Sequence, residues 1–181
     1  ETLNPSQSYL TDCKFYGGGG RYHWTGAGVV RNCEFTWTNT PVYESGFIII
    51  DGPSANVNFE NCIFNRTTGT PFIFTVLGNA VLTLSGNRFG QYCMALCSTN
   101  SRVNVTGNII SSDNGPTIFF DGSAYGHVAD NQILGAPANP TILIQGTSTR
   151  RSDGLSIVNN DITGHLQFSD TARGTNIIIA H

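Results

Sequence analysis

Charged residues are scarce in this chain of 181 residues, at 12% of the sequence, about half of the usual share of roughly a quarter. There is one lysine, Lys14, and the formal net charge is −3. Nucleic-acid binding normally requires a basic face, so this balance argues against a nucleic-acid partner. No apolar run of about 18 residues occurs, so we expect no membrane insertion.

The chain also lacks the start of a newly made protein. Its first residues, Glu1-Thr2-Leu3-Asn4-Pro5, include neither an initiator methionine nor the charged-then-apolar pattern of a signal peptide. We therefore expect a processed or excised piece of a longer polypeptide.

The cysteines, five in number, do not suggest disulfides. Cys13, Cys33 and Cys62 occupy the same position of a repeat described below, and stacked parallel strands lie about 4.8 Å apart with side chains aligned. A disulfide needs converging Cβ atoms about 3.8 Å apart. The sequence therefore predicts a ladder of free, buried thiols. Cys93 and Cys97 have no nearby pair of histidines or cysteines to complete a zinc site, so we expect neither a metal nor another cofactor.

Glycine and asparagine are abundant, and Val, Ile, Phe and Thr supply most of the apolar and β-branched content, which favours strands and turns over helices. A four-residue motif returns seven times, with its second residues 20 to 29 positions apart. A repeat of this length is typical of a solenoid. The seven copies are Asp12-Cys13-Lys14-Phe15, Asn32-Cys33-Glu34-Phe35, Asn61-Cys62-Ile63-Phe64, Gly86-Asn87-Arg88-Phe89, Gly107-Asn108-Ile109-Ile110, Asp130-Asn131-Gln132-Ile133 and Asn159-Asn160-Asp161-Ile162.

Short strands flank the motif. An alternating strand precedes it, as in Val57-Asn58-Phe59-Glu60, and a second strand follows the corner, as in residues 47–50. At the corner, Asn tolerates a left-handed backbone, while Phe or Ile points back inside. Coiling in one sense makes the strands parallel, and parallel crossovers are right-handed.

The sequence thus predicts an all-β, right-handed parallel β-helix of about seven coils. It forms a single domain over residues 1–181, with loop insertions at 36–46 and 136–153. An antiparallel sandwich is the alternative, but Asn-Gly and Asp-Gly hairpin turns between alternating strands are mostly missing.

The Asn-Cys-x-Phe and Gly-Asn-x-Ile corners, with the strands around them, resemble the pectate-lyase-like right-handed β-helix superfamily over about residues 10–179. Within that superfamily, the chain most resembles a piece of a tailed-phage tailspike, because of its low charge, its free cysteines and its missing leader. The resemblance implies a homotrimer on the virion tail surface (made in the host cytoplasm), or otherwise an extracellular protein. It implies binding, and often cleavage, of a bacterial surface polysaccharide. The Asn-Thr-Asp, Asp-Asp and Gly-His-Gly set of polygalacturonase-like members does not occur; Gly126-His127-Val128 comes nearest.

Glycoside hydrolysis uses two carboxyl groups, and those of inverting enzymes lie about 6.5–9.5 Å apart. Asp121 and Asp170 each follow the second strand of their coils, and Gln145 follows that of the coil between. Two coils of stacking would separate the carboxylates by about 9.6 Å. We predict this pair as the catalytic candidates and Gln145 as a substrate contact. The alternative is that these aspartates only cap turns.

Aromatic residues gather in the N-terminal third, after the glycine run 17–20. A glycine-rich loop leading into them would suit sugar binding, because flat aromatic faces combine contact area with a polar handle. The predicted substrate-binding residues here are Tyr22, His23, Trp24, Trp37 and Tyr43. The alternative is that these rings pack under the loop or line a subunit interface.

Three functions remain open from the sequence. The first is recognition of a host surface polysaccharide by a trimeric tailspike-like β-helix, with or without depolymerisation of that polysaccharide. The second is a free-standing carbohydrate-active enzyme, a glycoside hydrolase or lyase. The third is a purely structural rod or spacer. The fold alone does not choose among them.

Overall fold

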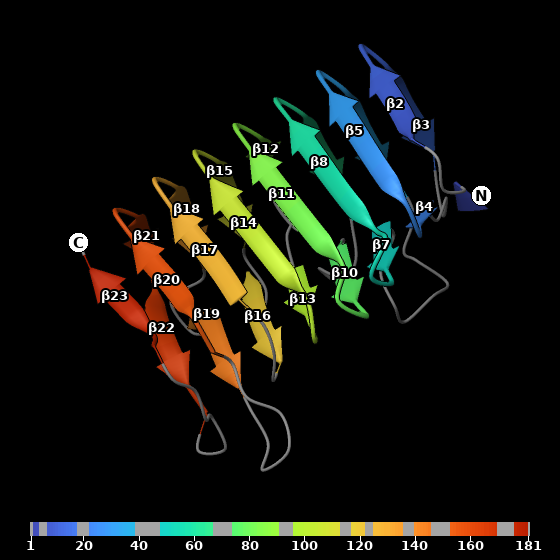
Figure 1. Cartoon of the computed structure of the whole chain (residues 1–181). Coiled ribbons are helices and arrows are strands. Elements are labelled where there is room, and N and C mark those ends of the chain that lie inside the picture. The colour runs from blue at the N-terminus through green and yellow to red at the C-terminus, as the bar shows by residue number, and fades with distance from the viewer. Residues whose placement is uncertain are drawn as a thin grey trace.

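The structure is a computed structural model that describes residues 2–3, 7–17, 22–38, 48–66, 74–90, 96–112, 117–121, 125–135, 140–145, 153–169 and 176–180. Within these ranges the regular secondary structure consists of β-strands alone, and all strand pairs are parallel. The strands stack from the N-terminal to the C-terminal end as successive coils (Figure 1). This arrangement confirms the predicted parallel β-helix and excludes the antiparallel sandwich.

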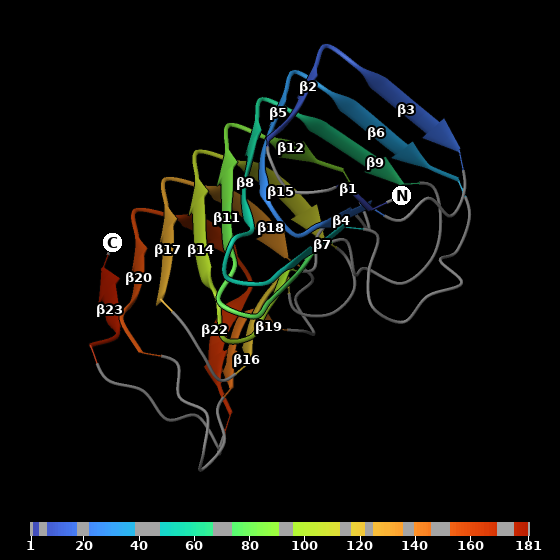
Figure 2. The ribbon, with the colours of Figure 1, turned by 45° about the vertical axis from the view of Figure 1, so that its right-hand side comes forward.

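Three sheets run the length of the stack. Sheet A contains β1 (Thr2–Leu3), β4 (Tyr22–Trp24), β7 (Ile48–Asp51), β10 (Phe74–Leu77), β13 (Leu96–Ser98), β16 (Ile118–Asp121), β19 (Pro140–Gln145) and β22 (His165–Phe168). Sheet B contains β2 (Ser8–Thr11), β5 (Ala27–Arg31), β8 (Asn56–Glu60), β11 (Val81–Ser85), β14 (Arg102–Thr106), β17 (Tyr125–Ala129), β20 (Leu155–Val158) and β23 (Ile178–Ala180). Sheet C contains β3 (Lys14–Gly17), β6 (Glu34–Trp37), β9 (Ile63–Arg66), β12 (Arg88–Phe89), β15 (Ile109–Ser112), β18 (Gln132–Gly135) and β21 (Asp161–Thr163). Each coil passes through A, B and C in turn (Figure 2).

The repeat motif forms the corner between sheets B and C. Its first residue has a left-handed backbone in all seven copies, with φ between 52° and 65°. Glycine, Asn and Asp adopt this conformation at the lowest cost, which is why only these three residue types stand there. The predicted left-handed backbone at the corner is therefore confirmed, but it belongs to the first motif residue and not to the second, where Cys or Asn stands.

The fourth motif residue points into the core. From Phe15 to Ile162 these residues lie opposite one another in neighbouring strands of sheet C. The rings of Phe35, Phe64 and Phe89 are buried and stacked nearly parallel, with successive centroids 5.2 and 4.7 Å apart. Such an interior row repeats the same contact in each coil, so identical packing is reused along the axis.

The second motif residue builds an internal polar ladder. Asn108 is 1% exposed; its Oδ1 accepts the backbone N–H of Asn87 at 2.8 Å, and its Nδ2 donates to Oδ1 of Asn131 at 2.9 Å. Asn131 relates to Asn160 in the same way. Toward the N-terminus Cys62 takes this place, and its backbone N–H donates to Oδ1 of Asn87 at 2.8 Å. The ladder thus satisfies buried backbone groups at a corner where the sheet ladders stop.

One expectation about the coil was wrong. We expected two strands and a turn, but the residues directly after the corner form a third strand, in sheet C. Each sheet C strand begins at the third motif residue, so it was counted as part of the corner and missed. The predicted insertions at 36–46 and 136–153 lie mostly outside the described residues and stay predictions; the described part of the second includes β19.

Candidate functional site: a groove along sheet B

The outer face of sheet B carries two continuous rows of side chains. Inward residues of its strands fill the core, so every second residue projects outward. The first row consists of Tyr9, Val29, Asn58, Thr83, Asn104, His127 and Ser156. The second consists of Ala27, Asn56, Val81, Arg102 and Tyr125. Six inter-strand steps from β2 to β20 give a face roughly 29 Å long.

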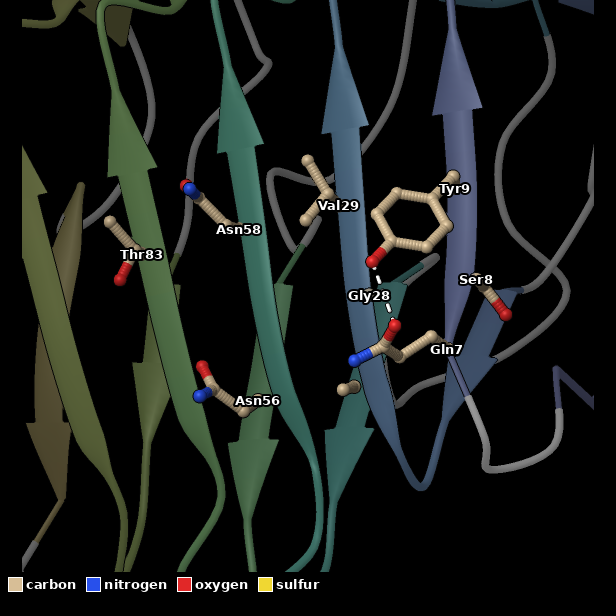
Figure 3. A pocket seen from close by; sticks show the side chains of 9 residues that line it. Gln7, Ser8, Tyr9, Gly28, Val29, Asn56, Asn58 and Thr83 are labelled. Atoms are coloured by element: carbon tan, nitrogen blue, oxygen red, sulfur yellow. Dashed lines mark hydrogen bonds between the residues drawn. The ribbon is translucent and has the colours of Figure 1, made fainter.

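Three hollows lie along these rows. One, of about 290 Å³, lies over Ala27, Asn58 and Thr83 with Tyr9 beside it (Figure 3). A second, of about 360 Å³, is bordered by Asn104, His127 and Ser156 among others. A third, of about 390 Å³, lies beside it toward Pro53 and Asn79, and Arg102 and Tyr125 border both. We call the two rows with these hollows the sheet B groove.

Tyrosines are exposed toward both ends of the groove. Tyr9 is 66% exposed and Tyr125 57% exposed. The Tyr9 hydroxyl donates to Oε1 of Gln7 at 2.8 Å, as Figure 3 shows. The Tyr125 ring lies against the Arg102 guanidinium, whose Cζ is 4.9 Å from the ring centroid. Each ring therefore has a polar contact that orients it, and amides and hydroxyls occupy most of the space between.

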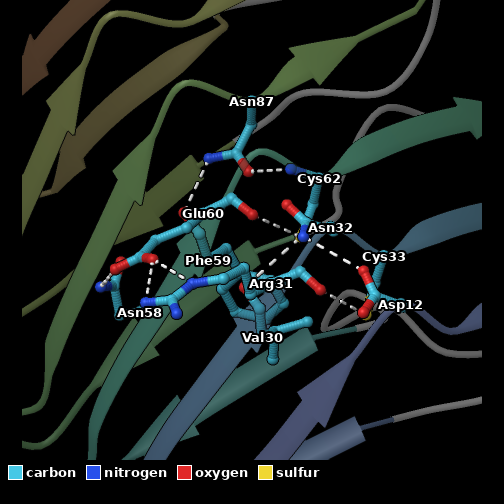
Figure 4. A network of polar contacts seen from close by, with 10 residues as sticks. All are labelled: Asp12, Val30, Arg31, Asn32, Cys33, Asn58, Phe59, Glu60, Cys62 and Asn87. Carbon is cyan, nitrogen blue, oxygen red and sulfur yellow. Dashed lines mark hydrogen bonds and ion pairs between the residues drawn. The ribbon is translucent and has the colours of Figure 1, made fainter.

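Charge is distributed unevenly at the groove. At its margin Arg31 forms an ion pair of 2.6 Å with Glu60, and Asn58 donates to the same carboxylate (Figure 4). No Asp or Glu is among the described residues that line the three hollows. No carboxylate of the described residues lies within ion-pair distance of Arg102. Among the described residues that line the hollows, Arg102 is thus the single Arg, Lys, Asp or Glu.

The thiol ladder is confirmed as free. Cys33 and Cys62 are buried and Cys13 is half-buried, all three without a disulfide. Burial raises the pKa of the Cys62 thiol to about 11 and also raises that of Cys33, so both stay protonated at neutral pH. Cys93 and the side chain of Cys97 lie outside the described residues. In the described part of the chain no group of three or more His, Cys, Asp or Glu could hold a metal ion.

The N-terminal aromatics are not arranged as we expected. Tyr22–Trp24 is a core strand of sheet A, paired on both sides, and not a loop. Trp24 is 1% and Trp37 4% exposed, and the Trp37 ring stacks on Phe35 at 5.7 Å. Their burial favours the alternative that these rings pack inside the fold.

The remaining predicted contacts are dispersed. Tyr22 and Trp37 do border one hollow, of about 360 Å³, beside β3 at the N-terminal end. His23 lies on the outer face of sheet A, half-buried, and its Nε2 has no partner among the described residues. Tyr43 lies outside the described residues.

Asp121 and Gln145 are neighbours in sheet A, opposite one another in β16 and β19. Asp170 lies outside the described residues, so the catalytic pair stays a prediction. Phe168 lies opposite Ile144, so the same register continued by one residue places Ser169 opposite Gln145. The Ser169 N–H donates to the Ile144 carbonyl at 3.0 Å, in agreement with that register.

Sequence reasoning missed the groove residues Asn104, Arg102, Tyr125 and His127. Their signal was present, because they occupy the outward half of the alternation that predicted the core. His127 is the central residue of β17 and projects from its outer face. Recognising the groove required knowing which strands share a register, and this follows from the three-strand coil.

A parallel β-helix with a polar groove along one sheet defines the class of this protein. Residues 2–162 match the family described as "Right handed beta helix region", and the chain belongs to that family. The match confirms the predicted right-handed β-helix and supports the pectate-lyase-like superfamily. No curated protein and no solved structure gave a significant match. Among the described residues there is no helix long and apolar enough to cross a membrane.

Proposed function

We propose that the protein binds a polysaccharide along the sheet B groove. One observation carries the proposal: three hollows, two of which adjoin, lie along the outer face of one sheet, with exposed tyrosines toward both ends and amide and hydroxyl side chains in register between them. A glycan chain presents repeated hydroxyls and flat apolar ring faces. Repeated hydrogen-bonding side chains about 4.8 Å apart, together with tyrosine rings, complement that pattern.

Binding accounts for the groove better than cleavage does. Glycoside hydrolysis normally requires a pair of Asp or Glu residues beside the bond, and no Asp or Glu is among the described residues lining the hollows. Asp121 belongs to sheet A and is not among the residues that line these hollows. Depolymerisation therefore needs a different site, and Asp121→Asn is the variant that tests for one: loss of turnover with retained binding would locate catalysis at Asp121.

The tailspike-like alternative extends the proposal to a bacterial surface polysaccharide and a homotrimer. Sedimentation velocity tests the assembly without any ligand. A species at three times the chain mass of 19.5 kDa would support the trimer, and a single species at the chain mass would contradict it.

An array of bacterial surface polysaccharides of known composition tests the groove, followed by titration calorimetry on any polysaccharide that binds. We expect Tyr125→Ala to weaken binding about tenfold, because stacked aromatic contacts contribute on the order of 1 kcal/mol beyond the area they bury. Tyr16→Ala is the matched control, since Tyr16 is 82% exposed on sheet C and outside the groove. Equal affinities of the two variants would move the binding site elsewhere. Absence of any bound polysaccharide would favour the structural rod.

A further inference from the structure

We propose that the C-terminal half of the sheet B groove contains a subsite for a negatively charged sugar residue, with Arg102 as the anion-binding group. This inference rests on the proposed function and adds the chemical class of the ligand. Arg102 projects outward from the first position of β14 and is exposed. It borders two adjoining hollows, so its guanidinium is available to a ligand lying in either.

Arg102 contacts an aromatic ring, whereas Lys14 and Arg31 are paired with carboxylates. Lys14 lies 3.2 Å from the carboxylate of Glu34, and Arg31 lies 2.6 Å from that of Glu60. Arg102 instead lies over the Tyr125 ring, with no carboxylate among the described residues within reach. An aromatic ring orients a guanidinium without neutralising its charge, and no described carboxylate occupies the N–H donors at its rim, which can therefore bind an anion.

The neighbouring side chains complete a binding site for an acidic sugar. Asn104 and His127 lie opposite one another on β14 and β17, and Ser156 continues the row on β20. All three border the same hollow as Arg102. Amide, imidazole and hydroxyl groups can hydrogen-bond the ring hydroxyls, while the planar guanidinium matches a carboxylate or sulfate in a bidentate arrangement.

The net charge of the chain does not itself favour anionic ligands, so a preference for them would have to come from the subsite. The chain carries a formal net charge of −3, so it does not attract polyanions as a whole. Selective binding of an anionic glycan would consequently require a specific cationic group rather than general attraction. The preference should weaken as salt is added, because a partly exposed charge pair is screened.

The test compares the wild-type chain with Arg102→Gln and Arg88→Gln on the same polysaccharide array. Arg88 is an exposed arginine of β12 in sheet C, so its substitution makes the same change of charge outside the groove. Two matched pairs are added: alginate with carboxyl-reduced alginate, and dextran sulfate with dextran. The first pair isolates the carboxylate and the second isolates the sulfate.

We expect acidic polysaccharides to bind in preference to neutral ones. We expect Arg102→Gln to weaken that binding by about ten- to a hundredfold, which is the range of one lost charge-assisted contact, and Arg88→Gln to leave it within about twofold. Arg102→Lys keeps the charge but not the planar fork, so it should retain the anionic preference at lower affinity. Circular dichroism of each variant verifies that it folds.

The outcomes separate the inference from the proposed function. Equal binding of acidic and neutral polysaccharides, or equal effects of Arg102→Gln and Arg88→Gln, would overturn the anionic subsite and leave the groove intact. Binding of no polysaccharide at all would overturn the proposed function and the subsite with it.

Discussion

Replacing Asn108 by alanine tests whether the internal ladder holds the coils together. Its Oδ1 accepts the Asn87 backbone N–H at 2.8 Å, and its Nδ2 donates to the Leu84 carbonyl at 3.0 Å and to Asn131 at 2.9 Å. The variant leaves one buried backbone donor without an acceptor, at a cost of about 1–3 kcal/mol, and removes further bonds worth about 1 kcal/mol each. We expect Asn108→Ala to lower the free energy of unfolding by about 4 kcal/mol in total.

Urea unfolding followed by circular dichroism measures this difference. Asn104→Ala is the control, since it makes the same substitution four residues earlier on the exposed face of β14 and should cost less than about 0.5 kcal/mol. Asn108→Cys should lose less than the alanine variant, because Cys62 fills the same ladder position and donates from its thiol to the carbonyls of Val30 and Glu60. A loss below about 1 kcal/mol for Asn108→Ala would refute the ladder as a main stabilising element.

Two other stability predictions follow from the core. Gly126→Ala would bring a Cβ atom within 2.7 Å of the Phe120 ring and 2.8 Å of Leu155, so we expect a loss of about 1–3 kcal/mol in the same urea assay. An unchanged urea midpoint would show that the core around Gly126 can accommodate a methyl group. For Cys62, the folded-state pKa is raised from 9.0 to about 11, so the folded protein holds its proton longer than the unfolded chain. Stability is therefore complete below pH 9 and falls by up to about 2–3 kcal/mol as the pH rises to 11. The pH slope should be smaller in Cys62→Ala.

The coil was predictable because its interior imposes a strict rule on the sequence. Left-handed corners admit only Gly, Asn and Asp without strain, and the residue three positions later must be apolar to fill the core. These two demands recur in every coil, so the motif stands out without any structure. Sheet C was missed because its strands begin at the third motif residue, so the motif itself, interpreted as a corner, contains the start of each strand.

The aromatic residues near the N-terminus show how composition misleads about function. Trp24 and Trp37 cluster with tyrosines in the sequence, which favoured a sugar-binding loop. Both occupy inward positions of strands, and Trp24 packs edge-on against Phe59 at 5.7 Å. Both tryptophan rings belong to a cluster of buried rings that includes Phe35, Phe59 and Phe64. A residue type therefore indicates a ligand only after its face of the strand is known.

The outward residues of sheet B are the ones that can take on a binding function. Inward residues of sheet B are fixed by packing and the ladder fixes the corner, so neither can change freely without a loss of stability. Outward residues contribute little to the core, and Arg102 could be replaced by many polar residues without affecting the fold. Its position over Tyr125, away from any described carboxylate, is therefore not a requirement of the β-helix. Arg88 is likewise exposed and has no carboxylate partner among the described residues, but it lies outside the groove. Arg102 borders two hollows of the groove, and a ligand bound there would explain its position most directly.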